Sequence, residues 1–212
     1  MLLGFTFLSP LFGLSQADST KKKIDFGFYV GADQSLMGVE ESENFVEGVT
    51  TNFSASGANA IGFHMGLVFA KQHSDQVHQR LFLGGRINNS EVTYSFSGQP
   101  DADRIIYPMS AQLGTLLGYQ LNATGHGIEI VGGGDLSYSI PTNKPTLDGL
   151  KEIDFHLKVG AGYLIQGRFA KVHMDLMYSH SLVNLLGDSQ DIYNLSLGRL
   201  QKHMITLTIS GY

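Results

Sequence analysis

Apolar and polar residues alternate along most of this chain, which is the pattern of β-strands with two different faces. Between residues 24 and 33, Ile, Phe, Phe, Val and Ala occupy the even positions, and Asp, Gly and Tyr occupy the odd ones. The same period recurs in seven further segments, at residues 61–70, 80–96, 107–119, 128–137, 153–165, 171–179 and 205–210. The phase of segment 80–96 shifts near Asn88 and Asn89, which predicts a β-bulge there. Most of these segments approach the length with which a strand crosses a membrane, about 9–11 residues.

The connections between these segments alternate in length. Four are long and rich in polar and small residues, at 34–57, 97–104, 141–150 and 181–200, whereas those at 71–78, 121–126 and 166–168 are short. Long loops outside and short turns in the periplasm are typical of bacterial outer-membrane barrels. We therefore predict an all-β fold over residues 18–212, a closed antiparallel up-and-down transmembrane β-barrel of about eight strands. An even strand number places both termini in the periplasm.

The two strand faces differ in chemistry. Phe, Ile, Leu, Val and Met dominate one face in mid-strand, where lipid would lie, and tyrosines near strand ends would form an interfacial girdle. These tyrosines are Tyr107, Tyr119, Tyr163, Tyr178 and Tyr212. Tyr212 is in phase with Thr206, Thr208 and Ser210, so it joins the girdle only if the strand kinks at Gly211.

The second face carries Gly and ionisable groups of both signs. A barrel of about eight strands has an interior that side chains can fill. We therefore expect an occluded lumen lined by a polar network rather than a pore. The expected network consists of Asp25, Arg80, Arg86, Glu129, Asp135, Asp154, His156, Lys158, Lys171, His173 and Asp175.

A soluble lipocalin-like binding barrel is the main structural alternative, because periodicity does not distinguish the inside of a barrel from its outside. The N-terminus favours export to a membrane. Residues 1–17 carry no charge, hold an apolar stretch too short to span a bilayer as a helix, and end in Ser15-Gln16-Ala17, which suits a signal peptidase. We expect residues 1–17 to be a signal peptide, although the usual basic residues at its start are missing.

Composition limits the remaining functions. Charged residues make up 16% of the chain, and the net charge of -5 gives no basic surface for nucleic acid. The chain has no cysteine, which excludes disulfides and thiolate metal sites. No phosphate-binding loop follows the glycine run at 132–134, and we expect no cofactor.

Two groups that contain histidine are candidate sites. His156 and His173 would face the lumen on adjacent strands near Asp154 and Asp175, where a His and carboxylate cluster could bind Zn²⁺. A hydrogen-bond network is the favoured interpretation, so no metal ligand is assigned. His180-Ser181 lies at the outer end of a strand, where some lipid A-modifying enzymes place such residues, but no orienting acid is evident beside it. We expect a non-catalytic barrel, with a lipid A-modifying enzyme as the alternative.

Partner binding would reside in the loops. The 181–200 connection is partly apolar, and exposed apolar loops often mark protein interfaces. Packing over the barrel mouth would account for the same residues equally well. The candidate partner-binding residues are Leu182, Leu185, Leu186, Ile192, Tyr193 and Leu195.

Three segments resemble the PorT-like outer-membrane barrel family of Bacteroidota, within the small outer-membrane β-barrel domains. They are KIDFGFYVGADQSL at 23–36, RIIYPMSAQLGTLLGY at 104–119, and the C-terminal half, including HLKVGAGYLI at 156–165 and LGRLQKHMITLTISGY at 197–212. The resemblance implies a place in the outer membrane and an accessory role in protein export by the type IX secretion system. It also implies outer-membrane lipid and other secretion proteins of the outer membrane or periplasm as partners.

Overall fold

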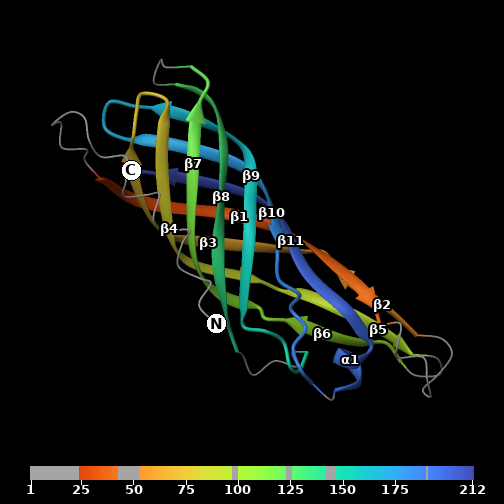
Figure 1. Cartoon of the computed structure of the whole chain (residues 1–212). Helices are drawn as coiled ribbons and strands as arrows, with labels where there is room; N and C mark the ends of the chain where they lie inside the picture. The colour runs from red at the N-terminus through yellow and green to blue at the C-terminus, as the bar shows by residue number, and fades with distance from the viewer. Residues whose placement is uncertain (1–23, 43–52, 97–99, 123–125, 142–146, 190) are drawn as a thin grey trace, which may run out of the picture.

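The computed structural model describes residues 24–42, 53–96, 100–122, 126–141, 147–189 and 191–212. The expected signal peptide at 1–17 lies outside these residues. Eight antiparallel strands close into a barrel in the order β1, β11, β10, β9, β8, β7, β4, β3 (Figure 1). They are β1 (Ile24–Glu41), β3 (Ala60–Gln72), β4 (Val77–Asn88), β7 (Met109–Gln120), β8 (Gly127–Ile140), β9 (Ile153–Gln166), β10 (Lys171–Ser181) and β11 (Leu197–Gly211). The predicted eight-stranded antiparallel barrel is confirmed.

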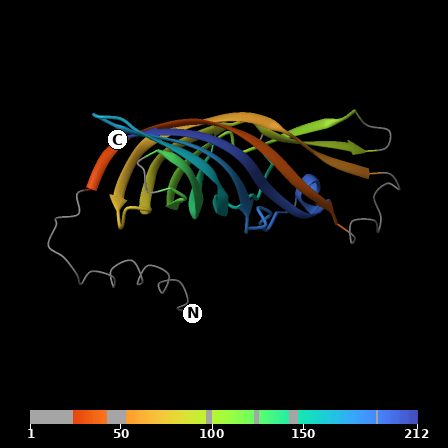
Figure 2. The same cartoon turned by 90° about the horizontal axis from the view of Figure 1, so that it is seen from above.

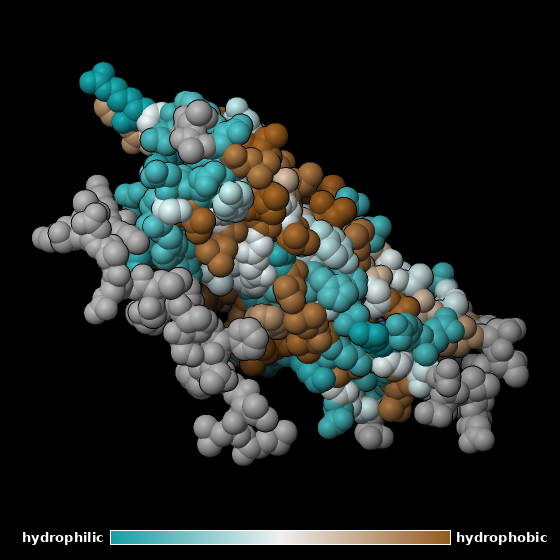
Figure 3. Space-filling view, turned by 45° about the horizontal axis from the view of Figure 1, so that its top comes forward, coloured by the Kyte–Doolittle hydropathy of each residue, from teal (hydrophilic) through white to brown (hydrophobic). Residues whose placement is uncertain are grey.

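The apolar face of every barrel strand points outward. Phe28 is 67% exposed and Ile61 is 73% exposed, whereas Tyr29 and Gly62, one residue further along, are buried. Apolar side chains gather over the middle of the barrel wall, and hydrophilic ones lie toward the end with the short turns (Figure 3). A soluble binding barrel would show the reverse, so the lipocalin-like alternative is wrong.

A second sheet extends the barrel at the end opposite the short turns. It consists of β2 (Phe53–Ala58), β5 (Ser90–Phe96) and β6 (Ala102–Ile106), in the order β2, β5, β6. With the short helix α1 (Ile192–Leu195) it forms a cap beyond the barrel (Figures 1 and 2). Where the sequence predicted long loops, β1 continues to Glu41, β6 occupies part of 97–104, and β11 begins at Leu197.

The phase shift at Asn88 and Asn89 is a change of sheet and not a bulge within one strand. β4 ends at Asn88, and β5 leaves the barrel to pair with β2 and β6. The apolar residues of β5, namely Val92, Tyr94 and Phe96, are therefore buried in the cap. They pack there with Ile106, Leu147, Leu150, Leu185, Leu197 and Leu200. Burial of these apolar side chains accounts for the regular structure of connections that the sequence predicted to be loops.

Two of the five expected girdle tyrosines lie elsewhere. Tyr119, Tyr163 and Tyr178 are between 41% and 47% exposed on the outer surface, as expected. Tyr107 packs against the cap core and its hydroxyl donates to the Leu150 carbonyl at 2.8 Å. Tyr212 enters the lumen, where its ring stacks on His173. The strand keeps its phase through Ser210 to Tyr212, and the expected kink at Gly211 is not needed.

Within the described ranges, no helix has the length and apolar character needed to cross a membrane.

Candidate functional site in the barrel lumen

Side chains fill the lumen in three layers. Because alternate residues of each strand point inward, residues two apart on one strand stack along the barrel axis. On β4, Arg80, Phe82 and Arg86 follow one another in this way, and Glu129, Val131 and Asp135 do so on β8. An apolar layer thus separates a polar layer near the short turns from a second polar layer below the cap.

The polar layer near the short turns centres on Arg80, which has no solvent exposure. Its guanidinium donates two hydrogen bonds to Asp175, at 2.6 and 3.0 Å, and one to Glu129 at 3.1 Å. His173 Nδ1 lies 2.9 Å from Glu129 Oε1, and His173 Nε2 lies 2.6 Å from the Tyr212 hydroxyl. Strands β4, β8, β10 and β11 are thereby joined across the lumen.

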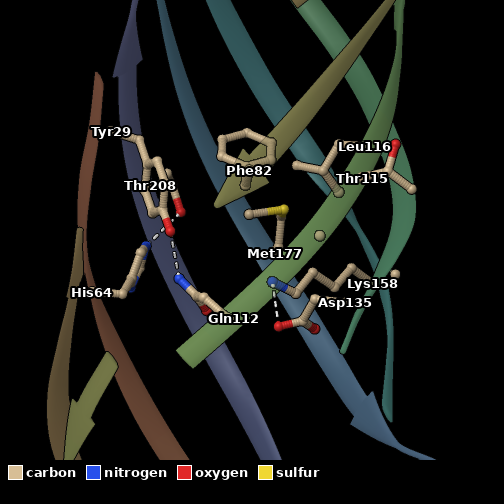
Figure 4. A pocket seen from close by; sticks show the side chains of 12 residues that line it. Tyr29, His64, Phe82, Gln112, Thr115, Leu116, Asp135, Lys158, Met177 and Thr208 are labelled. Atoms are coloured by element: carbon tan, nitrogen blue, oxygen red, sulfur yellow. Dashed lines mark hydrogen bonds and ion pairs between the residues drawn. The ribbon is translucent and has the colours of Figure 1, made fainter. Parts of the chain in front are cut away.

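The middle layer is apolar. Tyr29, Phe82, Leu116 and Met177 meet here, and Val68 and Val131 complete the cluster. Gln112 donates to the Tyr29 hydroxyl at 2.7 Å, which satisfies that buried group. Figure 4 shows Tyr29, Phe82, Leu116 and Met177 converging from different strands. The cavity that they line together with polar neighbours has a volume of about 20 Å³. Such a volume holds roughly one water molecule, so this layer blocks the lumen.

The polar layer below the cap is larger. Asp33 accepts a hydrogen bond from Arg86 Nε at 2.9 Å and one from Thr206 at 2.8 Å, and it lies 3.0 Å from His64 Nδ1. Asp135 lies 3.4 Å from Lys158 Nζ and 3.5 Å from His156 Nδ1. These groups make a second charge network that joins strands on opposite sides of the barrel.

The structure brings nine of the eleven expected lumen residues into these two networks: Arg80, Arg86, Glu129, Asp135, Asp154, His156, Lys158, His173 and Asp175. Asp25 and Lys171 are half-buried at the short-turn end. Sequence reasoning missed Asp33, His64, His78 and Tyr212 as members. All four are in phase with polar lumen positions of their own strands, and this signal would have found them.

His156 and His173 do not form the zinc cluster considered from the sequence. Along β9, His156 pairs with Ser181, and Leu164 pairs with His173. The two histidines are therefore offset by eight positions along β9, about 26 Å at the usual rise per residue. His156 instead lies 3.0 Å from Asp154, below the cap.

His180 and Ser181 point to opposite sides of the barrel wall. His180 is exposed, whereas Ser181 is buried and donates to Asp154 Oδ1 at 2.8 Å. An acid does lie beside Ser181, contrary to the expectation. However, the Ser181 hydroxyl donates to Asp154 and to the Val183 carbonyl, and within the described residues it makes no hydrogen bond to a histidine ring. His203 Nδ1 instead accepts from the Ser181 backbone nitrogen at 3.2 Å. The geometry does not support a nucleophilic serine here.

The six candidate partner-binding residues divide between the interior of the cap, its surface, and the rim of the barrel, where the Leu182 backbone nitrogen donates to the Phe155 carbonyl of β9. Leu185 is 3% exposed, and Leu186 and Tyr193 pack against the same core. Leu182, Ile192 and Leu195 are between 39% and 50% exposed. Arg104 lies over the Tyr193 ring at 4.1 Å, and burial raises the pKa of the neighbouring Tyr94 phenol. The cap is a packed body with a partly apolar surface.

Neither a scan against protein-family models nor a comparison with curated proteins finds a match. Among solved structures, the fold is similar to the crystal structure of the outer membrane protein OprG from Pseudomonas aeruginosa. The TM-score is 0.50, with 12% sequence identity, over 90% of this chain and 95% of that chain. At this identity the similarity shows the fold, a closed barrel of the outer-membrane type.

Proposed function

We propose that this chain is a non-catalytic outer-membrane β-barrel that presents its cap to a partner protein. The observation that carries the proposal is the combination of an apolar outer wall with a lumen filled by its own side chains. The wall suits lipid, since charged groups are confined to the lumen and the barrel ends. The filled lumen argues against transport through the barrel, so the cap is the proposed surface for contact with a partner protein.

The orientation follows from the same features. Short turns face the periplasm in bacterial barrels, and elaborate connections face outward. The cap is therefore proposed to face the cell exterior, with both chain ends in the periplasm. The exposed Ile192 and Leu195 of the cap, together with the exposed Leu182 at the adjoining rim of the barrel, are the proposed contact surface.

The resemblance to PorT-like barrels supports a finer proposal, an accessory role in the type IX secretion system. Deleting the gene should block export of that system's cargo proteins, and re-expression should restore it. Normal cargo export in the deletion strain would refute this assignment while leaving the broader proposal intact.

Affinity purification from the native outer membrane tests the broader proposal. The wild-type chain should retain a protein partner after cross-linking, and Leu182→Ser, Ile192→Ser and Leu195→Ser should weaken that retention. Glu91→Ser and Asp103→Ser, on the β5 and β6 strands of the cap, serve as matched controls and should retain the partner. The proposal fails if no partner is retained, or if the leucine and isoleucine variants retain it like the controls.

A lipid A-modifying enzyme is the alternative function, and its candidate His180 is exposed and stacks on His203 at 4.6 Å between ring centroids. Mass spectrometry of lipid A from cells with and without the chain distinguishes the two. The structure-based expectation is an unchanged lipid A mass.

A further inference from the structure

Three side chains from three non-adjacent strands converge at the short-turn end of the lumen. His78 on β4, Glu129 on β8 and His173 on β10 each lie within the first three residues of their strand. Each side chain offers one ligand atom, and these atoms all lie within 4.8 Å of one another. All three residues are buried, with exposures of 3%, 0% and 1%.

The charge network described above leaves part of this cluster unsatisfied. His78 Nε2 lies 3.3 Å from Glu129 Oε2, yet neither atom has a hydrogen-bond partner among the described residues. Buried polar atoms are normally hydrogen-bonded, and such exceptions require an explanation, a bound ion being one. The two unsatisfied atoms face each other beside His173.

We propose that His78, Glu129 and His173 bind one divalent transition-metal ion, with Zn²⁺ the best fit. Two imidazole nitrogens and one carboxylate oxygen form a typical zinc ligand set, which leaves a fourth position for water. Zinc bonds to these atoms are about 2.0–2.2 Å long, so small side-chain movements bring the three atoms to the ion. This site is separate from the partner-binding role proposed for the cap.

The surroundings of the cluster suit a cation. Arg80 makes two hydrogen bonds to Asp175, and its contact with Glu129 uses Oε1, which leaves Oε2 without a hydrogen-bond partner among the described residues. The ligand Glu129 and Asp175 are both ion-paired with Arg80, so this group of three side chains carries two negative charges and one positive charge. A divalent ion therefore meets a negative environment.

In metal-binding histidines, the ring nitrogen that does not bind the metal usually donates a hydrogen bond to a neighbouring group, and Tyr212 is placed to accept it. When His173 Nε2 donates to the Tyr212 oxygen, 2.6 Å away, the ring keeps a lone pair on Nδ1 for the metal. The absence of a side chain at Gly118 leaves room for the His78 ring, because a Cβ at residue 118 would collide with the ring atoms. The bound ion would tie β4, β8 and β10 together across the lumen.

The test uses the full-length barrel, without a polyhistidine tag, folded in detergent and stripped of metal with a chelator. Titration calorimetry should show one Zn²⁺ per chain, and Co²⁺ should give the absorption bands of a tetrahedral site. His78→Ala and Glu129→Gln should each weaken Zn²⁺ binding by about 100-fold or more, and Tyr212→Phe by roughly 10-fold.

Two features keep the result interpretable. His78 Nε2 has no hydrogen-bond partner among the described residues, and Glu129→Gln preserves the shape of the side chain, so both variants should fold, as circular dichroism will check. The control is the double variant His180→Ala/His203→Ala, which removes the exposed histidine pair and should bind Zn²⁺ like the wild type. Absence of stoichiometric binding overturns the proposal, as does wild-type affinity in both His78→Ala and Glu129→Gln, whatever the control shows.

Discussion

Removing the Arg80 side chain tests how far the buried ion pairs hold the barrel together. Arg80 makes three charge-assisted hydrogen bonds, of 2.6, 3.0 and 3.1 Å, to two carboxylates that are fully buried. Arg80→Met leaves Asp175 and Glu129 without their cation in an interior that water reaches poorly. Breaking a buried ion pair by removing one partner costs about 3–5 kcal/mol. We expect a loss of this size in the free energy of unfolding.

Urea unfolding in lipid vesicles, followed by circular dichroism because the chain has no tryptophan, measures this loss. The matched control is Arg199→Met, which breaks the exposed Arg199–Glu40 pair at 3.7 Å and should change stability by less than about 1 kcal/mol. Adding Asp175→Asn to Arg80→Met should cost less than the two single losses combined, by up to about 3 kcal/mol. If Arg80→Met is no more destabilising than Arg199→Met, the lumen network is not a source of stability.

Three further predictions address the wall, the cap and the lumen. Leu83→Arg places a charge on the outer wall at the level of the apolar layer and should cost about 2–4 kcal/mol in vesicle unfolding; a cost near zero would mean that water reaches this surface. Tyr94→Phe should leave stability nearly unchanged because the buried hydroxyl has no partner in the described structure, whereas Tyr94→Ala should cost about 3–5 kcal/mol and expose the cap to limited proteolysis; equal effects would contradict the packing of the cap core. The wild type should show no conductance in planar bilayers, while Tyr29→Ala/Phe82→Ala/Met177→Ala should show a leak, and a conducting wild type would refute the blocked lumen.

The barrel itself was predictable because each strand has one lipid-facing and one lumen-facing side. Because of this constraint, apolar residues recur at every second position of a strand, as at Ile24, Phe26 and Phe28. Polar lumen residues such as Arg80 and Asp175 could be predicted as well, because they occupy the positions between the lipid-facing residues of their strands. The phase of Tyr212 was read correctly, but the general preference for a lipid-facing terminal aromatic suggested a kink that the strand does not have.

The cap was not predictable from local pattern. Val92, Tyr94 and Phe96 alternate like a membrane strand, yet they pair with β2 and β6 and pack against Leu147, Leu185 and Leu200. These contacts join residues far apart in the sequence, so periodicity alone does not reveal them. The convergence of His78, Glu129 and His173 likewise depends on strand order and register, which a single strand does not encode.

Residue accessibility in a bilayer tests the central claim, a lipid-facing barrel wall, most directly. Because the chain has no cysteine, single cysteines carry spin labels without further changes. Labels at Leu83 and Val159, in mid-wall, should be reached readily by oxygen and poorly by a water-soluble nickel chelate. Labels at His126 and Lys151, beyond opposite ends of the barrel strands, should show the opposite preference. A chelate that reaches Leu83 and Val159 as readily as His126 and Lys151 would contradict the claim.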